Sequence, residues 1–530
     1  MTSAGDKSLG GLIRQLEGRG RLRSVLAPSD VRAAEIAVAG ISFDSRATKH
    51  GHVYVAIKGG RQDGHDFVAE AVAAGAGAVI AERALPLLGV PQLLVAEARP
   101  ALAVAAAWYH DNPSHQLGVV GVTGTDGKTT TCHLVRSMLS ACDLPAGMIS
   151  TIEVIVGGQS LGDTGHTTPD AVTVQADLAR MLAAGDRFAV VESTSHGLAL
   201  DRVAEVAFDV AVLTNITQEH LDLHRTPEAY RAAKRRLFEW LAESPANPAK
   251  GWPKSAVVNR EDPVADEFIA AARASGARVL TYAADSSAAA DVQATAVTDS
   301  PDGLKIRIAT PRWTDTLTLR LPGRFNVYNA LAAVCVGEAL DLDPQRMLSG
   351  LASVDGLSGR MERVDLGQPF TVFVDFAHTP GALAAALDAV APLAAAGGGG
   401  VISVFGSAGD RDVDKRPFMG RAAGERSRLV VLTDDDPRFE DRMTILEEIA
   451  AGAEAAGRRR DHDLLLIPDR NEAIQRALEL ARPGDVVLLA GKGHERTLAT
   501  REGPVPWDEA TSARTALAAL GYPVGVEAAP

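Results

Sequence analysis

The residue pattern with the clearest chemical use is a glycine-rich segment, Gly-Val-Thr-Gly-Thr-Asp-Gly-Lys-Thr-Thr, over residues 121–130. Glycines let backbone amides converge on phosphate oxygens, the Lys128 ammonium can neutralise the outer phosphates, and the Thr129 hydroxyl can reach Mg²⁺. Strict phosphate-loop spacing requires glycine at position 122, where this chain has Val122, so the segment is a variant loop. A chance glycine-rich turn is the alternative, but a strand-like run precedes the segment and a helical pattern follows it.

Two polar segments each follow an apolar run that is typical of a buried strand. One begins at Glu192, after Phe188–Val191, and the other, which contains His220, follows Val210–Thr214. Open α/β sheets bind ligands at the carboxyl ends of their strands, so Glu192 and His220 are candidate metal ligands. A solvated loop carboxylate and a packing imidazole are the alternative interpretations.

The next segment predicts a helix with an inward-facing lysine. Thr226 is the expected N-cap and Pro227 the first helical residue. Lys234 shares one helical face with Tyr230, Leu237, Phe238 and Leu241. Two interpretations are open. Either the lysine stem packs on the core with its ammonium in water, or partial desolvation favours the neutral amine, which can take up CO₂ and become a cation-binding carbamate.

The elements that must position these residues form three α/β units, because 530 residues exceed the roughly 250–300 that one core can hold. Strand-like runs alternate with alanine-rich helical stretches, and in the middle of the chain this predicts a doubly wound, mainly parallel sheet. The expected strands are Val53–Ile57, Ala78–Ile80, Gln92–Ala96, Gly118–Thr123, Phe188–Val191, Val210–Thr214, Phe370–Phe373, Gly400–Phe405, Leu429–Thr433 and Asp485–Ala490.

Composition argues against two classes of partner. With 53 basic and 67 acidic residues, the formal net charge is −14, which disfavours a sequence-blind nucleic-acid binder and docking on an anionic membrane. The three scattered cysteines are typical of reduced thiols. The N-terminus lacks a signal-peptide pattern, and no apolar stretch approaches the roughly 20 residues of a membrane span. We therefore expect a cytoplasmic protein with no membrane insertion and no nucleic-acid partner.

The ordered set of motifs resembles the Mur ligases of peptidoglycan synthesis, at the step that adds the third peptide residue, and the resemblance covers nearly the whole chain. It implies a three-domain α/β architecture. Residues 1–112 would bind the UDP-sugar, and residues 113–352 would form the central ATP-binding phosphate-loop domain with its doubly wound parallel sheet. Residues 353–530 would form a Rossmann-like domain that binds the incoming diamino acid and part of the ATP.

The resemblance also implies the residues of the ATP and metal sites. Asp126 stands where the family usually has asparagine. The implied ATP contacts are Gly124, Thr125, Asp126, Gly127, Lys128, Thr129, Thr130, Asn329, Arg360 and Asp375. The implied catalytic residues are Lys128, Glu192, His220, Lys234 and His378, and the implied Mg²⁺ ligands are Thr129, Glu192, His220 and Lys234 as a carbamate.

Two further sets are implied for the other substrates. Thr194 stands where the family typically has serine. The contacts to the UDP-muramyl dipeptide would be Ser45, Thr167, Thr168, Thr194 and Arg202. The contacts to the diamino acid would be Arg411, Asp435, Asp436, Arg438, Gly491 and Glu495.

The implied reaction transfers the γ-phosphoryl group of ATP to the γ-carboxylate of D-Glu in UDP-MurNAc-L-Ala-D-Glu, and an amine then displaces phosphate from the acyl phosphate. Arg438 suits the distal carboxylate of meso-diaminopimelate. Asp436, however, replaces the asparagine of the diaminopimelate pattern; its carboxylate would attract an ammonium and so favours L-lysine or L-ornithine, unless Arg411 or Arg438 cancels its charge. The expectation leans slightly to lysine or ornithine, with a monomeric enzyme.

Three rival functions share part of these motifs. A folylpolyglutamate synthetase has a similar ATP loop, but the full N-terminal unit with Asp44-Ser45-Arg46 argues against it. A phosphate-loop switch or motor leaves the Lys234 helix and Arg438 unexplained. A binding-only homologue is disfavoured because Lys128, Glu192, His220 and Lys234 occur together.

Overall fold

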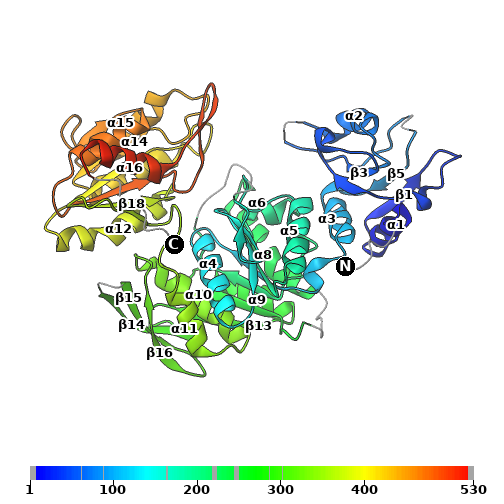
Figure 1. The fold of residues 1–530 in the computed structure, drawn as a ribbon, viewed down its shortest axis with the longest axis horizontal. Helices are drawn as coiled ribbons and strands as arrows, with labels where there is room; N and C mark the ends of the chain where they lie inside the picture. Colours follow the sequence, from blue (N-terminus) through cyan, green and yellow to red (C-terminus); the bar gives the residue numbers. More distant parts are fainter. Residues whose placement is uncertain are drawn as a thin grey trace.

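The computed structural model describes residues 7–60, 62–86, 89–162, 165–217, 224–243, 250–285, 287–300 and 303–522. The described residues form three large sheets, each covered by helices, and the sheet of the middle unit lies between the other two (Figure 1). This confirms the predicted α/β class with a doubly wound central sheet. Among the described residues, none of the helices has the length and apolar character needed to cross a bilayer.

The N-terminal unit is a five-stranded sheet with helices on both faces. Strand β1 runs antiparallel to β5, and the remaining neighbours are parallel. Helices α1 and α3 pack on one face and α2 on the other. In sheet order the strands are β1 (Leu22–Leu26), β5 (Gln92–Val95), β4 (Ala78–Ala81), β3 (His52–Val55) and β2 (Gly40–Ser42). The helices are α1 (Leu9–Gly18), η1 (Ala33–Glu35), η2 (Ser45–Ala47), η3 (Gly64–Phe67), α2 (Val68–Ala73) and α3 (Ala98–Tyr109), followed by the short helix η4 (Pro113–His115).

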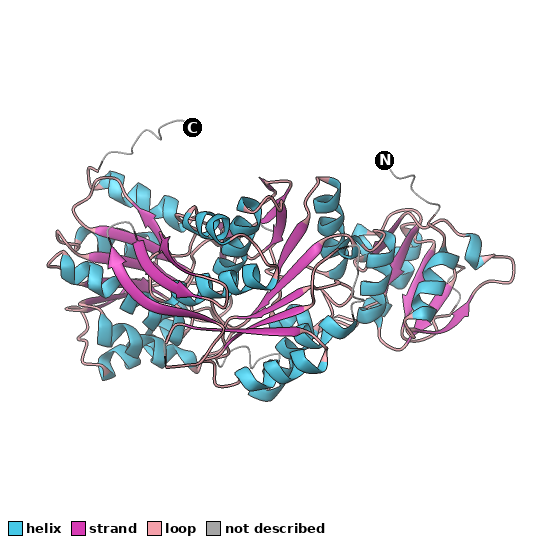
Figure 2. Ribbon diagram, turned by 90° about the horizontal axis from the view of Figure 1, so that it is seen from below, coloured by secondary structure: helices cyan, strands magenta, loops and turns pink. Residues whose placement is uncertain are grey.

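The central unit is an eleven-stranded sheet whose middle is parallel and whose two edges are antiparallel (Figure 2). Strand β6 lies between β10 and β11, so the order of strands reverses there, which is the place where open α/β sheets bind ligands. In sheet order the strands are β16 (Thr314–Leu319), β15 (Gly303–Ala309), β14 (Val292–Ser300), β13 (Arg278–Ala283), β12 (Ser255–Asn259), β11 (Val210–Leu213), β6 (Gly118–Thr123), β10 (Phe188–Glu192), β7 (Ala146–Ile149), β8 (Val154–Val156) and β9 (Gln159–Ser160).

Helices cover both faces of the parallel part of this sheet. One face packs on α4 (Lys128–Ala141), α10 (Phe325–Ala339) and α11 (Pro344–Ala352). The other packs on α5 (Ala171–Ala183), α6 (Ser195–Ala199), α8 (Pro227–Glu243) and α9 (Ala265–Ala274). Because both faces are buried, the middle strands are apolar along their whole length, as in Gly118–Thr123.

The third unit is a six-stranded sheet that is parallel except for its edge strand β17. Helices α12 to α14 cover one face, and α15 and α16 the other. In sheet order the strands are β17 (Glu362–Val364), β18 (Thr371–Asp375), β22 (Val486–Ala490), β19 (Val401–Phe405), β20 (Leu429–Leu432) and β21 (Leu464–Leu466), with a separate hairpin of β23 (Thr497–Thr500) and β24 (Gly503–Pro506). The helices are α12 (Pro380–Ala396), α13 (Lys415–Arg426), α14 (Arg442–Ala455), α15 (Arg470–Glu479) and α16 (Glu509–Ala519).

Candidate functional site

The glycine-rich loop joins β6 to α4 at the strand-order reversal, as predicted. Two of its glycines are needed for steric reasons. Gly127 has φ +80°, and a Cβ there would lie 2.3 Å from Oδ1 of Asn329. A Cβ at Gly124, which has φ +148°, would lie 1.8 Å from Oγ1 of Thr214. The loop therefore approaches α10 and the end of β11 too closely for any other residue.

The end of β11 holds the loop in place. The carbonyl of Asn215 accepts from the amide of Thr125 at 2.7 Å, and its Oδ1 accepts from the amide of Asp126 at 3.0 Å. Lys128 donates to the carbonyl of Thr125 at 2.6 Å, which closes the loop on itself. Asn215 is not among the site residues predicted from the sequence, although it lies in one of the polar segments that follow a strand.

Thr129 and Glu192 lie together beneath this loop. The Thr129 hydroxyl is 3.1 and 3.0 Å from the two carboxylate oxygens of Glu192, which also accepts from the Thr151 amide at 2.9 Å. Glu192 is 1% exposed, and Thr130, the residue after Thr129, is also buried on the first turn of α4. Hydroxyl and carboxylate oxygens are hard donors, so this pair suits Mg²⁺. His220, the other candidate ligand, lies outside the described residues.

Lys234 faces inward, as its helical position predicts. It is 1% exposed, donates to the carbonyl of Gly124 at 2.6 Å, and its Nζ lies 4.5 Å from the ring centroid of Tyr230. The interpretation in which its ammonium reaches water is therefore wrong. Tyr230 also contacts the loop, because its hydroxyl lies 3.0 Å from Oγ1 of Thr125. The predicted cap is present as well: Thr226 accepts from the Ala229 amide at 3.1 Å.

The third unit reaches the phosphate loop through Arg360. Its guanidinium donates to the Thr129 hydroxyl at 3.2 Å and lies 4.7 Å from the ring centroid of Phe376. Asp375, at the end of β18, accepts from the amides of Met361 and Ala377, both at 2.8 Å, and burial raises the pKa of its carboxyl. These bonds fix the turn that carries Arg360.

Two other implied nucleotide-site residues lie near the loop or the Arg360 turn. Asn329 is buried on α10, where its Oδ1 accepts from Thr131 at 3.3 Å and its amide donates to Asn326 at 2.9 Å. The ring of His378 lies 4.6 Å from that of Phe376, so it belongs to the same cluster as Arg360.

Three of the implied UDP-muramyl contacts form one hydrogen-bonded group. Thr168 and Thr194 hydroxyls lie 3.0 Å apart, and Arg202 donates to the Thr168 carbonyl at 2.7 Å. Thr167 accepts from Thr151, the neighbour of Glu192, at 3.0 Å. Ser45 is buried in the N-terminal unit, in the short helix η2. The group therefore adjoins the Thr129–Glu192 pair, and Ser45 belongs to a different unit of the chain.

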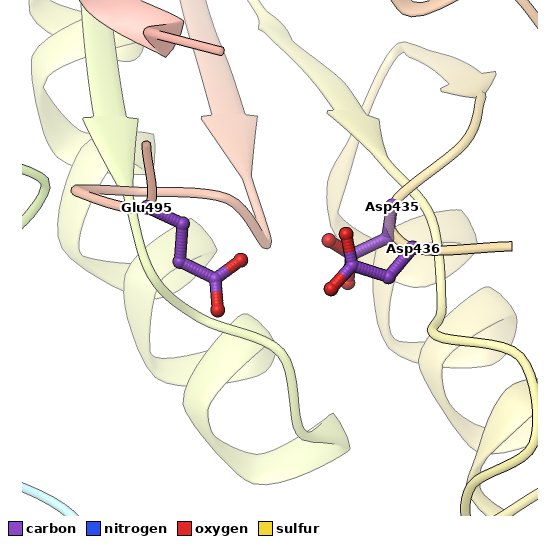
Figure 3. Close-up of side chains that lie close together, drawn as sticks. All are labelled: Asp435, Asp436 and Glu495. Atoms are coloured by element: carbon purple, nitrogen blue, oxygen red, sulfur yellow. The ribbon is translucent and has the colours of Figure 1, made fainter. Parts of the chain in front are cut away.

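An acidic cluster occupies the carboxyl end of the third sheet. Oxygen atoms of Asp435, Asp436 and Glu495 all lie within 4.8 Å of one another, and Figure 3 shows the Glu495 side chain facing the two aspartates from a separate loop. Lys492, from the same loop as Gly491 and Glu495, lies among them: its Nζ is 2.8 Å from Asp436 and also contacts Glu495. The ion-pair partner of Asp436 is thus Lys492, whereas the sequence suggested Arg411 or Arg438.

The remaining implied diamino-acid contacts border this cluster. Gly491 has φ +105°, and a Cβ there would lie 3.4 Å from Oδ2 of Asp435. Arg438 is half-buried with a left-handed backbone, φ +52°, and Arg411 is exposed on the neighbouring loop. That loop is tied to the cluster's backbone, because the Gly409 amide donates to the carbonyl of Asp436 at 2.8 Å.

Arg470, which is not among the site residues predicted from the sequence, connects the two loops that form the cluster. It is 2% exposed, donates to the carbonyls of Asp434 at 2.7 Å and Ala490 at 2.8 Å, and pairs with the buried Glu509. Asp434 follows β20, and Ala490 is the last residue of β22. A local pattern in the sequence does not identify this contact, because its four residues come from four separate segments.

Comparisons with known proteins identify the family of the chain. Three domain models match the chain: the Mur ligase family catalytic domain at residues 37–110, the Mur ligase middle domain at 122–337, and the Mur ligase glutamate ligase domain at 359–493. The chain is 48% identical to the UDP-N-acetylmuramyl-tripeptide synthetase of Roseiflexus sp. (strain RS-1) over 94% of this chain and 98% of that protein.

A second curated relative and a solved structure extend the match. The UDP-N-acetylmuramoyl-L-alanyl-D-glutamate--2,6-diaminopimelate ligase of Geobacillus kaustophilus is 38% identical over 91% of this chain and 96% of its own length. A structure of a ligase of the same name is 30% identical and superposes with a TM-score of 0.64 over 94% of this chain and 98% of that one. The chain therefore belongs to the Mur ligase family and is an ATP-dependent ligase that forms a peptide bond.

Proposed function

We propose that this ligase attaches a diamino acid to the γ-carboxylate of D-Glu in UDP-MurNAc-L-Ala-D-Glu, in the cytoplasm, as a monomer. The observation that carries the proposal is the Arg360–Thr129 hydrogen bond, which joins the sheet bearing the acidic cluster to the phosphate loop. One site could then hold ATP and the acceptor amine together. The tripeptide synthetase name of the relative at 48% identity supports the same step.

We assign each substrate to one unit. Residues 1–112, with Ser45, bind the uridine end of the UDP-sugar, and residues 113–352 bind ATP and, through Thr167, Thr168, Thr194 and Arg202, the muramyl dipeptide. Residues 353–530 bind the diamino acid and complete the ATP site. A family of folate-modifying ligases is a weaker match, because it leaves the five-stranded N-terminal sheet without a role.

The reaction proceeds in two steps. First, the bond between the β,γ-bridging oxygen and the γ-phosphorus of ATP breaks while a D-Glu carboxylate oxygen bonds to that phosphorus, which leaves ADP and an acyl phosphate. Second, the amine nitrogen attacks the acyl carbon, the carbon–oxygen bond to phosphate breaks, and the amine loses a proton. Lys128 and Arg360 stabilise the negative charge on the phosphoryl group during the first step. Mg²⁺ held by Thr129 and Glu192, together with His220 and Lys234, would supply further positive charge.

Carbamylation of Lys234 is part of this proposal. Burial disfavours a charged ammonium, so the neutral amine can bond to CO₂ with loss of one proton. The carbamate nitrogen keeps one hydrogen, which can still donate to the carbonyl of Gly124. The carbamate oxygens would then be available as ligands for a cation.

We propose L-lysine or L-ornithine as the amino acid. The name of the relative at 38% identity specifies 2,6-diaminopimelate, whereas the name of the relative at 48% identity specifies only a tripeptide. Three carboxylates and one ammonium leave the Asp435, Asp436 and Glu495 cluster with a negative charge, which favours a side chain that ends in an ammonium alone.

Mass spectra of the product formed with lysine, ornithine and meso-diaminopimelate in competition test this choice. We expect the lysine or ornithine tripeptide to dominate, and an Asp436→Asn variant to shift the preference towards diaminopimelate. Diaminopimelate as the preferred substrate of the unaltered chain would contradict the choice. ATP hydrolysis should also require both the UDP-dipeptide and the amino acid; hydrolysis independent of both would indicate a phosphate-loop switch.

A further inference from the structure

We infer that Lys492 is a positioning residue for the incoming amino acid, because it holds Asp436 and Glu495 together as the carboxylate pair that receives the substrate's side-chain ammonium. This inference rests on the proposed function. Lys492 sits between two glycines in the loop after β22, and the contacts implied for the diamino acid name Gly491 and Glu495 from this segment without giving Lys492 a role of its own.

The lysine is enclosed by carboxylates from two loops. It is 0% exposed; its Nζ contacts Oε2 of Glu495 and lies 2.8 Å from Oδ1 of Asp436 and 3.9 Å from Oδ1 of Asp435. Glu495 closes the same turn, since its amide donates to the Lys492 carbonyl at 2.9 Å. The aspartates instead follow β20, so the Lys492 side chain joins the two loops that form the pocket.

The cluster needs this internal cation. Three carboxylates whose oxygens lie within 4.8 Å repel one another when ionised. Burial alone would lower the pKa of Lys492, but Asp435, Glu495 and Asp436 outweigh it and raise that pKa, while burial raises the pKa of Glu495. Lys492 thus stays charged and keeps the carboxylates close.

The exposure of the carboxylates shows which of them a substrate can reach. The side chains of Glu495 and Asp436 are 37% and 17% exposed, whereas that of Asp435 is 9% exposed. Asp436 is further fixed by the amide of Ala499 at 2.8 Å. Lys492 therefore takes the inner position of the cluster, and the outer side of Asp436 and Glu495 remains for a second ammonium, from the substrate.

Steady-state kinetics of five proteins test the inference: the unaltered chain, Lys492→Met, Lys492→Arg, Asp436→Asn, and the double variant with Lys492→Met and Asp436→Asn. In Lys492→Met we expect KM for the preferred diamino acid to rise tenfold or more, while KM for ATP changes less than twofold. Lys492→Arg keeps the charge and should restore KM to within about threefold. An unchanged KM for the amino acid, or an equal rise in KM for ATP, would overturn the inference.

The double variant separates positioning from general stabilisation. If Lys492 acts through Asp436, the rise in KM caused by Lys492→Met should be at least threefold smaller in the Asp436→Asn background. The same rise in both backgrounds would refute that route. If Lys492→Met alone does not fold, the effect of Lys492 can still be measured by comparing Asp436→Asn with the double variant. The double variant lacks one carboxylate of the cluster, so the remaining carboxylates repel one another less. Absence of product from the unaltered chain with every diamino acid would instead refute the proposed function.

Discussion

Arg360 donates a hydrogen bond to the hydroxyl of Thr129 at 3.2 Å, although 231 residues separate the two along the chain. Thr129 belongs to the first turn of α4, and Arg360 belongs to the turn before β17 in the third unit. The same guanidinium lies over the ring of Phe376 at 4.7 Å. One side chain thus connects the phosphate loop with the sheet that carries the acidic cluster.

Replacing Arg360 with alanine should weaken ATP use more than use of the other substrates. A hydrogen bond to a charged group contributes about 1.5–3 kcal/mol, which corresponds to a loss of about 10- to 100-fold in kcat/KM for ATP. Arg363→Ala is the matched control, because Arg363 is 63% exposed and pairs with Asp365, two residues later. Equal kinetics of the two variants would contradict a role of Arg360 in the nucleotide site.

Replacing Lys234 with alanine should abolish most ligation while the protein stays folded. The buried Nζ lies on the carbonyl of Gly124, so its loss removes both a contact to the phosphate loop and the group that we propose to be carbamylated. Product formation and circular dichroism measure the two effects. Arg235→Ala, at the neighbouring and more exposed position on α8, should keep its activity.

Short carboxylic acids test the chemistry of Lys234 separately. A carboxylate that enters the space left by the side chain can replace the carbamate oxygens, so added acetate or propionate should restore part of the activity of Lys234→Ala. Full activity of this variant without added acid would refute the carbamate.

The sequence predicts the strands of this protein better than the contacts between them. The ten expected strands are all present, and their ends lie within one or two residues of the predicted ends. They could be predicted because buried parallel strands are apolar along their length. Other strands are not among them, including the buried parallel strands β7 and β12 and the antiparallel strands β14 to β16. In β15, Leu304, Ile306 and Ile308 alternate with more exposed residues, as a half-buried strand requires, and these polar positions break the continuous apolar run on which the predictions rest.

In the candidate site too, local patterns predict single residues and loops but not the contacts between distant segments. Local pattern is enough to place the phosphate loop after β6 and to turn Lys234 inward. The ion-pair partner of Asp436 is Lys492, which lies 56 residues later in the chain and comes close only through the fold. Charge and nearness in sequence instead predict Arg411 or Arg438 as the partner. His220, placed by the same pattern reasoning, stays a prediction.

Breaking the buried pair of Arg470 and Glu509 should destabilise the third unit strongly. Both side chains are at most 1% exposed, and removing one partner of such a pair costs about 3–5 kcal/mol because the other charge is left without compensation. Urea unfolding of Glu509→Ala measures this loss. Glu479→Ala removes a more exposed pair with Arg476 and should cost less than about 1 kcal/mol. Similar losses of unfolding free energy in both variants would contradict this role of the Arg470–Glu509 pair.

His494 should make stability depend on pH in the acidic range. Its side chain is buried next to Phe376, and burial, with Arg360 nearby, lowers its pKa from 6.5 to about 3. Between these two values the unfolded chain binds a proton that the folded chain does not, so stability falls as the pH decreases from 6.5 towards 3 and is unaffected by this group above 6.5. From pH 7.5 to pH 5 the expected loss is about 2 kcal/mol.

Urea unfolding at pH 7.5 and pH 5 measures this dependence, because the slope due to one group disappears when that group is removed. In His494→Gln the difference between the two pH values should shrink by about 2 kcal/mol. In His462→Gln it should match that of the unaltered chain, since the His462 side chain is 66% exposed and is not part of this buried cluster. If His494→Gln kept the full difference, the acid sensitivity would have to come from other buried groups, such as His133, whose pKa burial lowers to about 4.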